Sequence, residues 1–200
     1  PLQWHLNSTP KRGQLLDRTD VRATEAWKQS NGGRGVVVAV VDSLIQWDHP
    51  DLIQNIYKSG NHPDKLPSEE YGWDFSSSGE GDADTRLSSQ ELALIQTEWQ
   101  NTFKLPAEQL IKKYQQLADS FLKRNPKASK SEIAHYIRNQ IRLTISGEFH
   151  GTWSAGVIAA NSPDKSGVLG VAPNTQILPV RVFGLGGVIN SASLTEAIGY

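Results

Sequence analysis

The sequence predicts an α/β domain with a mostly parallel sheet, interrupted by a block of helices. Two apolar runs, residues 36–41 and 175–183, have the length and branched side chains of buried strands. A helix of small residues beginning at His150 precedes the second run. This strand, helix, strand order is typical of a parallel sheet. Residues 85–147 instead repeat their apolar positions at helical spacing.

The N-terminal residues 1–35 predict an arm with one short helix, at residues 19–29. Its candidate buried positions are Val21, Ala23, Ala26 and Trp27. The glycines of residues 31–35 end this helix and lead into the first strand. They do not predict a dinucleotide site, because a phosphate-binding loop follows its strand and these glycines precede theirs.

The first strand ends at Asp42, and a polar loop follows it. Residues 71–75 predict a short strand, and residues 76–84 a turn-forming segment. The last strand ends at Gly184. Residues 184–187 are rich in glycine but lack the Lys-Ser/Thr of a phosphate loop, so they predict a turn.

Three amphipathic helices are expected within residues 86–146. Capping-box patterns mark the starts of two of them, at Ser88 with Glu91 and at Ser129 with Glu132. Between these lies a longer helix that begins after Pro106 and carries a stripe of apolar residues. The stripe consists of Leu110, Ile111, Tyr114, Leu117, Ala118, Phe121 and Leu122.

A third capping-box pattern, Ser193 with Glu196, predicts a helix at the C-terminal end of the sequence. Only about two turns of this helix are present. Isolated helices of that length are marginal in water, so we expect the chain to be part of a longer protein.

Composition excludes several functions. The formal net charge of −1 and the lack of long charge runs argue against nucleic-acid and membrane surfaces. The absence of cysteine excludes disulfides, thiolate catalysis and cysteine zinc sites. No apolar run reaches the ~18 residues of a spanning helix.

Asp42 and His150 form the most informative pair in the sequence. Taken singly, an aspartate at a strand end and a histidine at a helix start are ordinary capping residues. Together, a buried acid that holds a histidine in one tautomer supplies two members of a hydrolytic triad, whose third member would be a serine.

Five segments in this order resemble the subtilisin-like serine proteases, or subtilases. They are residues 3–6, residues 42–43 with 49–52, residues 72–75, residues 150–152, and residues 170–173 with 178–182. The resemblance covers roughly residues 1–84 and 148–200. It implies a three-layer subtilisin-like fold, with residues 1–200 forming the N-terminal portion of one peptidase domain and residues 86–146 an insertion within it.

The resemblance also implies a serine endopeptidase that hydrolyses polypeptide substrates, in a secreted or periplasmic location. Asp42 would orient His150, and His150 would act as general base and then general acid. The family's serine follows a Gly-Thr-Ser segment, which this sequence lacks. We therefore expect the serine and the oxyanion asparagine on a C-terminal portion of the same protease, and no turnover by this chain alone.

Two residues depart from the family pattern. Leu44 stands where subtilases usually have glycine, and Trp153 stands where a second histidine is common. Leu44 favours an alternative, a catalytically inactive subtilase-fold protein used for binding. The insertion allows two interpretations as well: a packed elaboration without a role of its own, or a lid or docking surface beside the substrate.

The resemblance further implies a structural calcium ion. Asp51 matches a ligand of that ion, with Asn161 and backbone oxygens of residues 161–166 as its partners. Hard oxygen ligands suit calcium. Asp82 and Asp84 form a second acidic loop, for which solvation is the first expectation. The remaining histidines, at positions 5, 49, 62 and 135, show no metal-binding spacing.

Overall fold

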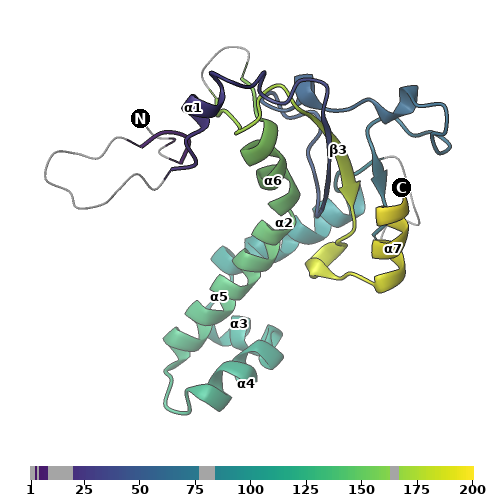
Figure 1. The fold of residues 1–200 in the computed structure, drawn as a ribbon. Coiled ribbons are helices and arrows are strands. Elements are labelled where there is room, and N and C mark those ends of the chain that lie inside the picture. The colour runs from purple at the N-terminus through teal and green to yellow at the C-terminus, as the bar shows by residue number, and fades with distance from the viewer. Residues whose placement is uncertain (1–2, 4, 9–19, 77–83, 163–166) are drawn as a thin grey trace, which may run out of the picture.

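Three parallel strands form a sheet at one end of the molecule, and the helices of residues 86–146 extend away from it (Figure 1). The computed structural model describes residues 3, 5–8, 20–76, 84–162 and 167–200. The strands are β1 (Val37–Asp42), β2 (Trp73–Asp74) and β3 (Gln176–Arg181), in the order β1-β3-β2. The α/β architecture with a parallel sheet is thus confirmed, although β2 and β3 are shorter than the apolar runs that predicted them.

The strand register places three charged residues side by side at the carboxyl edge of the sheet. Asp42 of β1 lies opposite Arg181 of β3, and Asp74 of β2 lies opposite Arg181 from the other side. Ligand-binding groups in open parallel sheets gather at this edge.

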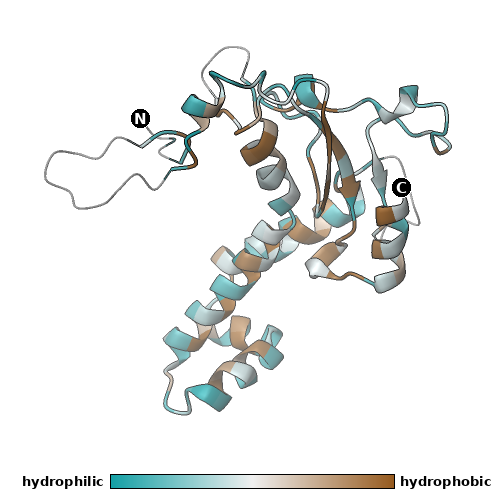
Figure 2. Ribbon diagram, viewed as in Figure 1, coloured by the Kyte–Doolittle hydropathy of each residue, from teal (hydrophilic) through white to brown (hydrophobic). Residues whose placement is uncertain are grey.

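One helix covers each face of the sheet, which gives three layers. Helix α6 (His150–Ala159) packs on one face, and its small residues bring it close to the strands. Helix α7 (Ser191–Gly199) covers the other face through Ala197, which contacts Val180 and Val182. Figure 2 shows hydrophobic residues in α6 and in the strands between the two helices. The hydrophobic core between α6 and the sheet consists of Val40, Ile45, Leu52, Ile56, Ala155, Ala159, Ala160 and Ile177.

The N-terminal helix α1 (Ala23–Ala26) is a single turn, shorter than expected. Of its predicted core residues Ala23 is buried, whereas Val21 and Ala26 are exposed. Trp27 fixes the arm differently, because its indole Nε1 donates to the carbonyl oxygen of Val171 at 2.8 Å. Two short 3-10 helices, η1 (Ile53–Asn55) and η2 (Ser59–Asn61), follow β1.

The insertion contains four helices rather than three. They are α2 (Ser89–Lys104), α3 (Ala107–Lys113), α4 (Gln115–Arg124) and α5 (Lys130–Gly147). Both capping boxes, at Ser88 and Ser129, are confirmed. The middle helix breaks at Tyr114, whose φ of −112° and ψ of 48° are not helical. The helices bury Leu110, Ala118, Ile133, Ala134, Ile137 and Ile141 against one another.

An ion pair joins the insertion to the sheet. Arg181, of which only 1% of the side chain is exposed, donates to Glu91 of α2 at 2.7 Å and to Asp74 at 3.0 Å. Burial opposes ionisation of Glu91, but hydrogen bonds from Arg181 and Ser88 outweigh it and lower the pKa of Glu91. Both carboxylates therefore compensate one buried guanidinium.

The C-terminal helix begins earlier than its capping pattern predicted. Asn190 is the N-cap of α7, and its Oδ1 accepts a hydrogen bond from the Ser193 backbone N–H at 2.7 Å. The prediction of a capping box at Ser193 is therefore wrong, because Ser193 already lies inside the first turn. The predicted turn at residues 184–187 is confirmed as the 3-10 turn η3 (Leu185–Gly187). Among the described residues, no helix is long and apolar enough to cross a membrane.

Candidate active site

Asp42 occupies the last position of β1, at the carboxyl edge of the sheet. Its Oδ1 accepts a hydrogen bond from the backbone N–H of Ser43 at 2.6 Å, which fixes the carboxylate at the turn. Only 15% of the side chain is exposed. The carboxylate is therefore held in part by the backbone of the next residue, independently of its partners on other elements.

His150 is the first residue of α6, which follows α5 after only two intervening residues. The next residue is glycine for a steric reason. A Cβ atom on Gly151 would lie 2.5 Å from the Ser43 carbonyl oxygen and 2.8 Å from that of Leu44. The Gly151 N–H also donates to Ser43 Oγ at 3.1 Å. Glycine thus lets the start of α6 approach the end of β1.

This close approach brings His150 onto Asp42. The imidazole Nδ1 lies 2.9 Å from both carboxylate oxygens of Asp42. Ser154, one turn along α6, donates from its hydroxyl to Asp42 Oδ2 at 3.0 Å. Burial opposes ionisation of Asp42, but its bonds with Ser43, His150 and Ser154 lower its pKa. The pair joins residues 108 positions apart in the sequence.

A cavity of about 360 Å³ opens beside this pair. His150 is 64% exposed, so its imidazole is accessible from solvent while the carboxylate stays covered. A covered carboxylate that accepts from Nδ1 leaves Nε2 to exchange a proton with a bound reactant, as a general base requires. The cavity is lined by Asp42, Ser43, Leu143, Thr144, Gly147, Glu148, His150, Phe183, Gly186 and Gly187.

The two departures from the family pattern are accommodated in different ways. Leu44 is buried, and its carbonyl oxygen accepts a hydrogen bond from Thr152 Oγ1 at 3.2 Å. Its φ is not positive, so leucine fits this turn without backbone strain. Trp153 is exposed and lines a different cavity from the one beside His150.

The two predicted calcium ligands lie at the same loop. The backbone N–H of Asn161 donates to the carbonyl oxygen of Asp51 at 2.8 Å. The Asp51 carboxylate accepts from the Val168 N–H at 3.2 Å, while the Asn161 amide nitrogen donates to the Pro173 carbonyl at 3.1 Å. Residues 163–166 of this loop lie outside the described residues.

These contacts fit one carboxylate and one amide oxygen beside a common loop, which is the right chemistry for calcium but only part of its usual six to eight ligands. Within the described residues, no group of three or more His, Cys, Asp or Glu side chains has metal-binding geometry. Asp84 of the second acidic loop pairs with Arg86 at 3.0 Å instead of standing in solvent alone. Asp82 lies outside the described residues.

Sequence reasoning missed Ser154 and Glu148. Ser154 lies four residues after His150, hence on the same helix face, and this spacing can be seen in the sequence. Glu148 is 3% exposed, and its Oε1 accepts from the Gly186 N–H at 2.6 Å. Nothing local in the sequence distinguishes Glu148 from a solvated residue at a helix end.

Comparison with known proteins places these features in a family. The family described as "Subtilase family" matches residues 33–200 of the chain. Similar proteins include furin-like protease 2 of Drosophila melanogaster, 37% identical over 73 residues, and furin of Bos taurus, 40% identical over 55 residues. Human proprotein convertase subtilisin/kexin type 7 is 34% identical over 73 residues.

The matches cover 34%, 28% and 34% of this chain, respectively. They cover only 4%, 6% and 9% of the relatives. The chain therefore corresponds to a small part of each of these proteins.

Proposed function

Because this chain belongs to the subtilase family, we propose that the protein is a serine endopeptidase whose triad includes Asp42 and His150. The observation that carries this proposal is the 2.9 Å contact between His150 Nδ1 and the Asp42 carboxylate, formed beside an open cavity. The similarity to a furin and a furin-like protease supports peptide-bond hydrolysis as the reaction.

In this mechanism Asp42 accepts the Nδ1 hydrogen bond and holds the imidazole in one tautomer. His150 Nε2 takes the proton of a serine hydroxyl as that oxygen attacks the peptide carbonyl, and then gives the proton to the leaving amine. The acyl-enzyme formed on the serine is released by water through the same base. The serine and the oxyanion asparagine would be supplied from outside residues 1–200, so this chain alone would be inactive.

Fluorophosphonate labelling of the full-length protein tests this proposal. The reagent should label one serine outside residues 1–200, located by mass spectrometry. His150→Ala should slow labelling by roughly 10³-fold or more, because the serine loses its base. His135→Ala is the matched control, since His135 lies exposed on α5, away from the site, and should leave the rate unchanged.

A folded full-length protein that takes up no label would contradict the proposal. That outcome would favour the alternative, an inactive subtilase-fold protein used for binding. We propose separately that the protein is secreted or periplasmic. Fractionation of the producing cells tests this, with the protein assayed in the culture medium, the periplasm and the cytoplasm.

We also propose that Asp51 and Asn161 contribute to a structural calcium site. The proposal is supported by the backbone hydrogen bond from Asn161 to Asp51 and by the oxygen chemistry of the two side chains. Calcium at 100 times its dissociation constant should stabilise the fold by about 2.7 kcal/mol, measured as a rise in melting temperature over the chelated protein. Asp51→Asn should abolish this rise, whereas Asp64→Asn, in an exposed loop, should retain it. An equal rise in both variants would place calcium elsewhere.

A further inference from the structure

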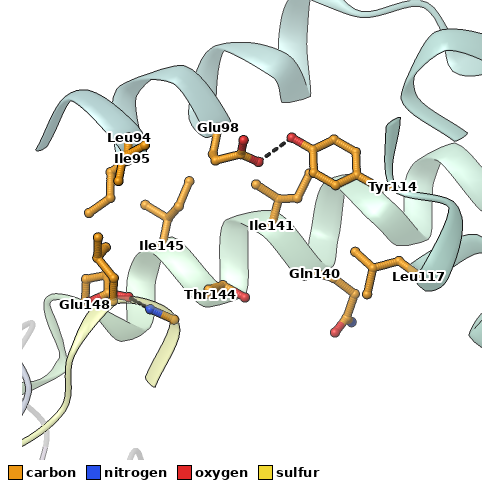
Figure 3. A pocket seen from close by; sticks show the side chains of 12 residues that line it. Leu94, Ile95, Glu98, Tyr114, Leu117, Gln140, Ile141, Thr144, Ile145 and Glu148 are labelled. Atoms are coloured by element: carbon orange, nitrogen blue, oxygen red, sulfur yellow. Dashed lines mark hydrogen bonds between the residues drawn. The ribbon is translucent and has the colours of Figure 1, made fainter. Parts of the chain in front are cut away.

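A second cavity, of about 400 Å³, lies between the insertion and the turn that follows β3 (Figure 3). Leu94 and Ile95 of α2 line one wall, and Ile141 and Ile145 of α5 point toward them from the opposite wall. Leu117 of α4 lies at the far end. Aliphatic side chains thus dominate a space formed mainly by helices of the insertion.

This insertion cavity adjoins the cavity beside His150. The two share three lining residues: Thr144 and Glu148 at the end of α5, and Gly186 in the turn. Glu148 stands only two positions before His150. A polypeptide bound with its scissile bond at His150 would therefore reach the insertion cavity within a few residues, each of which spans ~3.3 Å when extended.

The carboxylates in the insertion cavity are already engaged by the protein. Glu98 accepts a hydrogen bond from the Tyr114 hydroxyl and lies 3.5 Å from Lys113 Nζ. Glu148 accepts from the Gly186 N–H, and burial raises the pKa of Glu148. With both acids held by partners within the fold, the remaining lining suits an apolar ligand better than a basic one.

The turn that borders both cavities is rich in glycine and sterically open. Gly186 and Gly187 both have positive φ, at 76° and 74°. A Cβ atom at either position would meet no other atom within 4 Å. Both glycines are exposed, so the backbone of this turn is accessible to a ligand.

We infer that the insertion cavity is a specificity subsite that receives an aliphatic or aromatic side chain of the polypeptide substrate. This inference rests on the proposed endopeptidase function. It gives the insertion a definite role, because α2 and α5 supply an apolar wall that extends the substrate cleft beyond Asp42 and His150.

The test uses two leucines of α2. Leu94 is 60% exposed and lines the cavity; Leu92 is 43% exposed and does not. The full-length protein would be assayed with hexapeptides carrying leucine, phenylalanine or alanine at each position in turn. Leu94→Asp should lower kcat/KM by ~10-fold for peptides with leucine or phenylalanine at one position, relative to alanine there. Leu92→Asp should leave this preference intact.

Equal preferences in the two variants would overturn the subsite. Failure of the endopeptidase function would look different, because the wild type would then cleave no peptide at all. In that case, fluorescence anisotropy with fluorescein-labelled copies of the same hexapeptides measures their binding to the two variants. Weaker binding of the leucine and phenylalanine peptides to Leu94→Asp alone would still support the cavity as their site, and equal binding to both variants would overturn it.

Discussion

Ser154 gives Asp42 a third hydrogen-bond donor, besides the Ser43 N–H and His150. The hydroxyl lies on the face of α6 that carries His150, and it also lies 3.4 Å from Nδ1. A hydroxyl in this position stabilises the ionised carboxylate and limits its rotation. We therefore regard Ser154 as a positioning residue that acts through Asp42.

Ser154→Ala should raise the pKa of Asp42, because the ionised form loses a donor. The carbon-13 NMR titration of the Asp42 carboxyl measures this directly. Fluorophosphonate labelling of the full-length protein should slow by ~10-fold, the effect of losing roughly 1.5 kcal/mol from a hydrogen bond to a charged group. Ser154→Thr, which keeps the hydroxyl, should restore both values. A merely structural role would leave the Asp42 titration unmoved.

The sequence predicts the two proposed catalytic residues better than the buried charged residues around them. Asp42 and His150 stand out because each follows a strong pattern of its own, a buried strand and a small-residue helix. Arg181 and Glu148 do not stand out, because their burial depends on elements far away in the sequence.

The helices of the insertion show where local signals suffice. At the start of α5, Ser129 Oγ accepts a hydrogen bond from the Glu132 N–H, and the Glu132 carboxylate accepts one from the Ser129 N–H. Both partners lie within four residues, so the start of α5 is readable from the sequence. At α7 the local pattern is ambiguous, because both Asn190 and Ser193 are good N-cap residues and Asn190 begins the helix three residues earlier.

Ser129→Ala should lower the free energy of unfolding by ~1 kcal/mol, because one N–H at the start of α5 loses its acceptor. Ser131→Ala is the matched control, since Ser131 lies two residues further along in the first turn and does not form the cap. Urea denaturation compares the two variants with the wild type. Equal losses in both would contradict the capping role.

The break between α3 and α4 was beyond sequence reasoning for a tertiary reason. The apolar stripe runs through Tyr114 without interruption, so periodicity alone predicts one helix. In the fold, the Tyr114 hydroxyl donates to Glu98 and accepts from Asn101, both on α2. Burial and the neighbouring Glu98 raise the pKa of Tyr114 to about 12. The hydroxyl therefore stays protonated and continues to donate.

At the scale of the whole molecule, the ion pair between Arg181 and Glu91 joins the insertion to the sheet. Glu91 has a folded-state pKa below its unfolded value of ~4.3. The ion pair of Glu91 therefore stabilises the fold fully at pH values above the unfolded-state pKa. This stabilisation is lost as the pH falls through the folded-state pKa. Acid should weaken this junction while the apolar cores on either side remain.

Glu91→Gln should lower the free energy of unfolding at pH 7 by about 1.5–3 kcal/mol, because Arg181 loses a charged acceptor and keeps Asp74. The difference from the wild type should shrink when urea denaturation is repeated below the folded-state pKa. Glu108→Gln, in an exposed pair with Lys130, should change neither measurement. A pH-independent difference would show that the charge of Glu91 is not responsible.

The Glu91–Arg181 contact also determines how this protein can be re-engineered. Residues 86–146 resemble a cassette that could be excised or grafted, yet excision removes Glu91, a counter-ion of the buried Arg181 at the carboxyl edge of the sheet. A shortened variant should therefore retain the first turn of α2, because replacing Arg181 with an apolar residue would remove the cation that faces the buried Asp74. A scaffold that receives the graft would need a buried cation at the end of the strand that takes the place of β3, to pair with Glu91.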